Sequence, residues 1–126
     1  MSYSDSPRLR GSGYSLANQQ APSVTAGAAA GTGATATVAG GDERGVVTVT
    51  AAGTPADTGV LVTLTFATPY TIAPDAVVIQ QNDANPALTF YVSAVTTAHF
   101  VVTMKGSVAP TAADVYKLHY LVIGGA

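Results

Sequence analysis

Two histidines, His99 and His119, are the side chains of this 126-residue chain best suited to acid–base chemistry. A histidine oriented by a carboxylate, such as Asp75 or Asp114, acts as a general base in many hydrolases. The positions do not favour this use, because His99 ends the turn-like stretch VTTAHF and His119 falls in the middle of an expected strand. A catalytic zinc ion needs three protein ligands held in a fixed arrangement, and two histidines at unrelated positions do not supply them. We therefore expect no catalytic residue, no metal site and no enzyme activity.

Two stretches match the patterns of ligand-binding loops. GTGATA, residues 31–36, fits the G-x-G-x-x-A dinucleotide pattern, but no hydrophobic parallel strand precedes it, so we expect a lead-in to a strand and no cofactor. QQNDANPAL offers oxygen ligands that calcium accepts. Turns use the same residue types, and calcium sites usually have more than one carboxylate ligand. We therefore expect a turn, with a calcium site as the weaker alternative. These residues are Gln80, Gln81, Asn82, Asp83 and Asn85.

Aromatic side chains are the remaining candidates for a binding site, because sugars stack on aromatic rings. The chain has no tryptophan, and the strand pattern directs Phe90, Tyr116 and Tyr120 inward. A carbohydrate-binding module, the alternative from a different functional class, would therefore depend on Tyr70, Tyr91 and the Asn/Asp loop.

The low charge content separates this chain from several classes of protein. Only 10% of residues are charged, against about 25% in an average soluble domain, and the net charge is -2. Five Lys and Arg residues spread along the chain do not make a nucleic-acid surface. There is no cysteine for a disulfide or a thiolate metal site, no apolar run after the early arginines for a signal peptide, and no membrane-length apolar segment. We expect neither nucleic acid nor membrane as a partner.

The composition changes near Ala21 and Pro22. Residues 1–21 are rich in Ser, Gly, Asn and Gln and cannot build a core, so they are predicted to form an extended N-terminal arm. The apolar anchors and the arginines expected to reach carboxylates on a partner subunit are Tyr3, Arg8, Leu9, Arg10, Tyr14 and Leu16.

Residues 22–126 are predicted to form one all-β domain. Short runs rich in Val, Thr and aromatic residues alternate with turn sequences such as GGDERG and AAGTPADTG. This pattern predicts an antiparallel β-sandwich, jelly-roll-like, with the extended arm in front of it. The expected strands are Ser23–Ala26, Ala34–Ala39, Val46–Ala51, Val60–Phe66, Ala76–Gln80, Thr89–Ala94, Phe100–Lys105 and Val115–Ile123.

The period of two along each strand assigns the two faces. The stretch GVLVTLTF places Val60, Val62, Leu64 and Phe66 inward and Leu61, Thr63 and Thr65 outward. The other inward residues are expected to be Phe90, Val92, Phe100, Val102, Met104, Tyr116, Leu118, Tyr120 and Val122. The outward faces carry Thr, Ser and apolar residues with only Lys105 and Lys117 as charges, which suggests that they are covered by other subunits.

The long run from GTGATATVAGG to APDAVVI, with FYVSAVTTAHFVVT and the closing YKLHYLVIG, resembles a β-sandwich domain of tailed-bacteriophage virion proteins. The resemblance covers about residues 22 to 124. It rests on Thr-rich strands, the motif TFATPY at the end of one strand and the terminal motif YLVIG. It includes no catalytic motif.

The resemblance implies a virion structural protein, assembled in the host cytoplasm. The expected function is that of a capsid decoration protein, a trimer that binds the major capsid protein or another virion protein and stabilises the head. The alternative within the virion is a tail-fibre or tail-tip knob that binds a receptor. Domains of this group often form the end of a long fibre polypeptide. The short arm of this chain therefore favours a small capsid decoration protein that attaches directly to a larger lattice.

Overall fold

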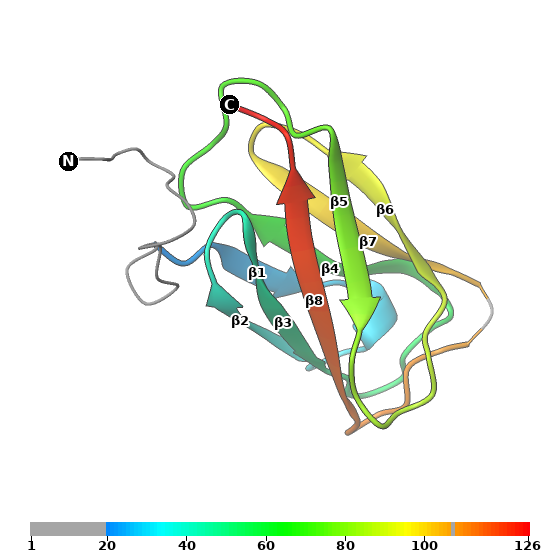
Figure 1. Ribbon diagram of the computed structural model, residues 1–126. Helices are drawn as coiled ribbons and strands as arrows, with labels where there is room; N and C mark the ends of the chain where they lie inside the picture. The colour runs from blue at the N-terminus through cyan, green and yellow to red at the C-terminus, as the bar shows by residue number, and fades with distance from the viewer. Residues whose placement is uncertain (1–19, 107) are drawn as a thin grey trace.

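Eight β-strands form the frame of the described part of this computed structural model, residues 20–106 and 108–126 (Figure 1). Each predicted strand is present, with bounds within two residues of those expected. A single 3₁₀ turn, η2 (Ala28–Ala30), follows the first strand. The strands are β1 (Ser23–Ala26), β2 (Thr35–Gly40), β3 (Arg44–Thr50), β4 (Thr58–Thr65), β5 (Ala76–Gln81), β6 (Phe90–Val95), β7 (His99–Lys105) and β8 (Val115–Ile123).

The strands form two four-stranded antiparallel sheets that pack face to face, which confirms the predicted β-sandwich. Sheet A has the order β1-β4-β7-β6 and sheet B the order β2-β3-β8-β5. Only β2–β3 and β6–β7 are consecutive strands paired in one sheet, and the other connections cross between the sheets. Within the described residues, no helix is long and apolar enough to cross a membrane.

The core lies between the sheets and consists mainly of the residues that the period of two directed inward. Phe90 and Val92 lie near the edge of sheet A and are partly buried against this core. Phe100 lies between Phe66 and Tyr120, with ring centroids 6.1 and 5.7 Å away. The buried members of the predicted set are Val62, Leu64, Phe66, Phe100, Val102, Met104, Tyr116, Leu118, Tyr120 and Val122.

Leu61 and Val60 exchange the positions that the sequence pattern predicted for them. Leu61 is fully buried, whereas Val60 is half-buried and does not join the core. The cause is a register shift in β4: Val60 pairs with Thr103 and Val62 with the next residue of β7, Val102, so that Leu61 is an extra residue. A bulge of this kind interrupts the strict alternation of faces.

Gly27 allows the chain to pack tightly against this bulge. Its N–H donates to the Leu61 carbonyl at 2.8 Å, and a Cβ at position 27 would stand 2.2 Å from the Val60 carbonyl oxygen. The η2 turn therefore packs directly against β4, the strand in which Leu61 is fully buried.

Candidate functional site

The two histidines lie on opposite sheets, and among the described residues no hydrogen bond joins either imidazole ring to Asp75 or Asp114. His99 belongs to β7 of sheet A and His119 to β8 of sheet B. The His99 N–H donates to Thr96 Oγ1 at 3.1 Å, a turn contact, and His119 Nε2 lies 3.5 Å from the Asn82 amide nitrogen. Among the described residues, no three His, Asp or Glu side chains gather closely enough to hold a metal ion.

The loop considered for calcium is a structural brace between β5 and β8. Asp83 Oδ1 accepts hydrogen bonds from the Asn85 N–H at 2.9 Å and the Gln81 side-chain amide at 3.0 Å, and Oδ2 accepts one from the Lys117 N–H at 2.8 Å. The Gln81 side-chain oxygen accepts a fourth bond, from the Leu88 N–H at 2.8 Å. The chain's own donors thus occupy the carboxylate, as expected of a turn.

Replacing Asp83 by Asn is expected to lower the free energy of unfolding by about 1 to 3 kcal/mol at neutral pH. The reason is that the NH2 group of the asparagine side chain cannot accept a hydrogen bond where a carboxylate oxygen did. Partial burial acts to raise the pKa of Asp83, but the hydrogen bonds from Lys117, Gln81 and Asn85 and the Lys117 charge bring this pKa below 3.8, the usual value for an aspartate. Stability from this carboxylate is therefore present above about pH 3.8 and is lost as the pH falls further.

Urea unfolding of the wild type and Asp83→Asn between neutral pH and pH 3 tests this prediction. The difference between the two proteins should shrink at the acid end of the series. Asp57→Asn is the matched control, since the Asp57 carboxylate accepts no hydrogen bond from the described residues. A constant difference across the series would show that the Asp83 charge does not stabilise the loop.

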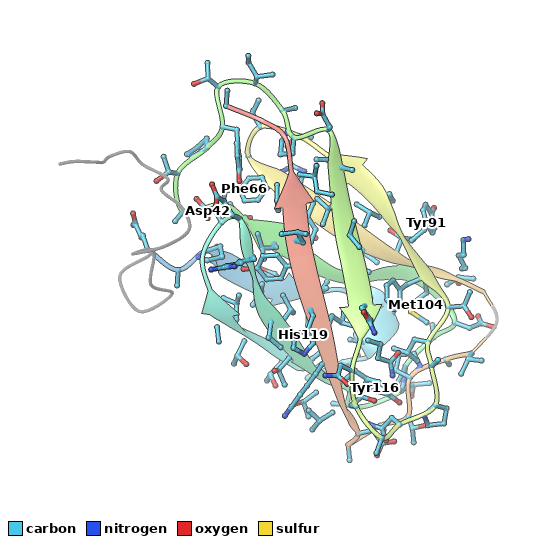
Figure 2. All side chains as sticks on the ribbon, viewed as in Figure 1. Asp42, Phe66, Tyr91, Met104, Tyr116 and His119 are labelled. Carbon is cyan, nitrogen blue, oxygen red and sulfur yellow. The ribbon has the colours of Figure 1, made fainter. Side chains whose placement is uncertain are left out.

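The outer face of sheet B carries an apolar stripe over β5 and β8. Val78 and Leu121 are direct partners across these strands and are 52% and 48% exposed, and Ile123, paired with Ala76, is 44% exposed. Arg44, Val46, His119 and Leu121 line a shallow depression beside the stripe. Figure 2 shows His119 on β8, in the middle of this face.

The outer face of sheet A is lined by hydroxyl groups instead. Threonine and serine pair across neighbouring strands, as in Thr25 with Thr63 and Ser23 with Thr65. Thr103 Oγ1 donates to Ser93 Oγ at 2.7 Å, and Tyr91 projects from this face (Figure 2). The face offers hydrogen-bonding groups without charge, apart from Lys105 at its end and the titratable His99.

Charges are segregated between strands and turns. The three basic residues of the described part lie in strands, whereas all six acidic residues lie in turns and connections. The strand faces therefore carry no carboxylate to keep another protein surface away. The basic residues are Arg44, Lys105 and Lys117, and the acidic residues are Asp42, Glu43, Asp57, Asp75, Asp83 and Asp114.

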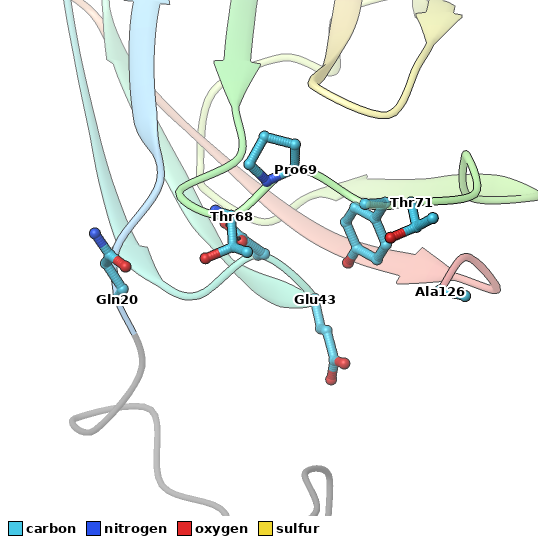
Figure 3. A pocket seen from close by; sticks show the side chains of 8 residues that line it. Gln20, Glu43, Thr68, Pro69, Thr71 and Ala126 are labelled. Atoms are coloured by element: carbon cyan, nitrogen blue, oxygen red, sulfur yellow. Dashed lines mark hydrogen bonds between the residues drawn. The ribbon is translucent and has the colours of Figure 1, made fainter.

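A hollow of about 520 Å³ lies at the end of the sandwich where the β2–β3 turn meets the segment after β4 (Figure 3). We call it the end hollow. The buried Tyr120 holds the β2–β3 turn in place, because its hydroxyl donates to the Gly41 carbonyl. Gly45 leaves room for this hydroxyl, since a Cβ on Gly45 would stand 2.7 Å from it. Burial, with smaller contributions from Asp42 and Tyr70, raises the pKa of Tyr120. The lining residues are Gln20, Asp42, Glu43, Thr68, Pro69, Tyr70, Thr71 and Ala126.

Asp42 joins the two sides of the end hollow. Its two carboxylate oxygens accept the N–H groups of Ala67 at 2.7 Å and Thr68 at 2.9 Å, residues of the TFATPY stretch. Asp42 is not among the site residues predicted from the sequence. Its position in the turn sequence GGDERG is the one feature that could have indicated a role for this carboxylate. Nothing in the sequence shows which backbone N–H groups lie opposite it in the fold.

The residues predicted for binding are only partly placed by the structure. The arm anchors Tyr3, Arg8, Leu9, Arg10, Tyr14 and Leu16 lie outside the described residues, and Gln20, at the end of the predicted arm, lines the end hollow.

The parts of the carbohydrate-binding alternative are not brought together. The Tyr70 ring lies beside Gly125, past one end of β8, whereas Asn85 bonds the Val115 carbonyl at the other end of that strand. Tyr91 lies apart from both, on the outer face of sheet A.

Comparisons with protein-family models, with curated proteins and with solved structures found no match to this chain.

Proposed function

We propose that this chain is a virion structural protein of a tailed bacteriophage, and specifically a trimeric capsid decoration protein. The observation that carries the proposal is the character of the outer strand faces, which hold no carboxylate and, on sheet B, an exposed apolar stripe of Val78, Leu121 and Ile123. Large exposed apolar surfaces mark sites where proteins associate. The resemblance of residues 22–124 to phage β-sandwich domains supports the same function.

In this role the protein works mechanically. A sandwich that packs its faces against sibling subunits or the capsid surface adds buried area between neighbouring capsid subunits, and the gain resists internal pressure. Stable interfaces of this sort bury on the order of 1,000 Å² or more. Threonine suits such a face, because it favours strands and offers a hydroxyl for hydrogen bonds.

The end hollow favours a second candidate, a receptor-binding knob on a tail fibre. Its lining includes the carboxylates of Asp42 and Glu43 and the hydroxyls of Thr68 and Thr71. Carboxylates accept hydrogen bonds and hydroxyls both donate and accept them, which matches the hydroxyl groups of a sugar.

Light scattering of the purified chain and quantification on purified particles test the proposal together. We expect a mass near three times 12.6 kDa in solution and many copies on isolated heads. Binding to isolated tails, together with glycan binding that Thr68→Ala weakens, would favour the receptor-binding knob. A monomer in solution that is also missing from purified particles would contradict both candidates.

A further inference from the structure

We infer that the outer face of sheet B binds an acidic protein surface on the phage head. In this contact, Arg44 and Lys117 pair with carboxylates of the partner, and the stripe of Val78, Leu121 and Ile123 packs against its apolar groups. This inference rests on the proposed function, to which it adds the face that binds and the chemistry of the partner.

Exposed large apolar side chains of the described strands are concentrated on the outer face of sheet B. Val78, Val115, Leu121 and Ile123 lie there and are 39 to 52% exposed, whereas Tyr91 is the one such side chain in the described strands of sheet A. The outer face of sheet A is lined instead by hydroxyl groups, which water solvates well. Sheet B therefore gains more than sheet A from being covered.

The same face carries positive charge. Its four strands contain Arg44 and Lys117 and no carboxylate. Arg44 pairs with Leu121 across β3 and β8, and Lys117 lies four residues before Leu121 on β8. The backbone positions of the two basic residues are therefore separated by about 13 Å along the strands.

The chain does not neutralise these two charges by direct contact. Within the described residues, no hydrogen bond or salt bridge is made by the Arg44 guanidinium or the Lys117 ammonium group. The Lys117 charge acts on Asp83, but that carboxylate accepts its hydrogen bonds from backbone and amide N–H groups. Both basic groups can therefore pair with carboxylates of another molecule.

Charge selects the partner of this face. Two copies packed through this face would bring basic residues together without a carboxylate between them, and like charges repel. A nucleic acid needs a run of basic residues to neutralise its phosphates, whereas this face has two. A protein surface that combines apolar side chains with Asp or Glu matches both the stripe and the charge.

The orientation of the protein on the head follows from this assignment. The outer faces of the two sheets lie on opposite sides of the sandwich, and in Figure 2 they are marked by Tyr91 on β6 and His119 on β8. A protein that binds the head through sheet B turns the hydroxyl-lined face of sheet A toward the solvent.

Charge reversal tests this assignment on isolated heads that lack the protein. Arg44→Glu and Lys117→Glu, each in the full-length chain, should weaken co-sedimentation with the heads several-fold, and the double variant by about tenfold or more. Lys105→Glu is the matched control, because it makes the same charge change at an exposed lysine of sheet A and should leave binding unchanged. Melting curves check that each variant is folded. Added salt should weaken wild-type binding more than that of the double variant, since salt screens the charges.

The apolar part of the contact has its own pair of variants. Leu121→Ser removes a 48% exposed side chain from sheet B and should weaken binding to the heads several-fold. Tyr91→Ser removes a 45% exposed side chain from sheet A and should not.

A carbodiimide cross-linker tests the chemistry of the partner, because it joins an amine directly to a carboxylate in contact with it. The chain has two lysines, Lys105 on sheet A and Lys117 on sheet B. On heads saturated with the protein, mass spectrometry should find Lys117 linked to an Asp or Glu of a head protein. Lys105 should not be linked to head proteins.

Unchanged binding after both charge reversals on sheet B, or equal weakening by Lys105→Glu, would overturn the inference and leave the proposed function intact. Lys117 linked to a second copy of the chain in the absence of heads, with Lys117→Glu a monomer in light scattering, would assign the face to a sibling subunit and also overturn the inference. Wild-type protein that does not bind the heads would contradict the proposed function and the inference with it.

Discussion

Replacing Phe66 with alanine is expected to lower the free energy of unfolding by about 3 to 5 kcal/mol, the usual cost of removing a buried aromatic ring. Phe66 is 4% exposed and lies between the sheets. Its ring meets that of Tyr70 edge-on, with centroids 4.8 Å apart, and the Phe100 ring is tilted against it at 6.1 Å. The loss should lower the melting temperature by about 10 °C or more, measured by circular dichroism.

Ile72→Ala is the control for this measurement. Ile72 is 62% exposed, and substitutions at such positions change stability by about 0.5 kcal/mol or less. If Phe66→Ala melts at the wild-type temperature while folding normally, Phe66 is not in the core.

Phe66 also connects the core to the end hollow. Its N–H donates to the Ala98 carbonyl at 2.9 Å, and its ring supports Tyr70, which lines the hollow. The segment from Phe66 to Thr71 is therefore fixed from two directions, by the core on one side and by Asp42 on the other.

The strands and most of the core could be predicted from the sequence because their signals are local. In β8, the alternation of Tyr116, Leu118, Tyr120 and Val122 with exposed residues is unbroken over nine positions, and the structure buries each of the four. Turn residues mark the strand ends equally well, since Gly, Pro and Asp favour the backbone conformations of turns. The hydroxyl-lined face of sheet A follows from the same alternation.

The features that depend on distant contacts could not be predicted. Asp42 binds backbone groups 25 and 26 residues away, and Asp83 binds the backbone of Lys117, 34 residues away. A carboxylate in a turn sequence carries no sign of such a partner. The two Asp42 bonds join the sides of the end hollow, which therefore forms only when the chain is folded. The bulge in β4 belongs to the same class, because pairing with β7 creates it.

The bulge leads to a prediction that distinguishes the structure from strict alternation, because the two place different residues, Leu61 and Val60, in the core. Leu61→Ala is expected to cost about 2 to 5 kcal/mol of unfolding free energy, because Leu61 is 0% exposed and belongs to the hydrophobic core. Val60→Ala should cost well under half as much, because Val60 is only half-buried and outside the core. Strict alternation along the strand predicts the reverse order.

Urea unfolding of the two single variants and of the double variant decides between these orders. The Gly27 N–H bond to the Leu61 carbonyl does not involve either side chain, so both substitutions leave the backbone contact available. The difference in cost then reports burial of the side chains. A larger loss for Val60→Ala would place Val60 in the core and Leu61 on the outer face, and it would show that β4 pairs with β7 without the extra residue.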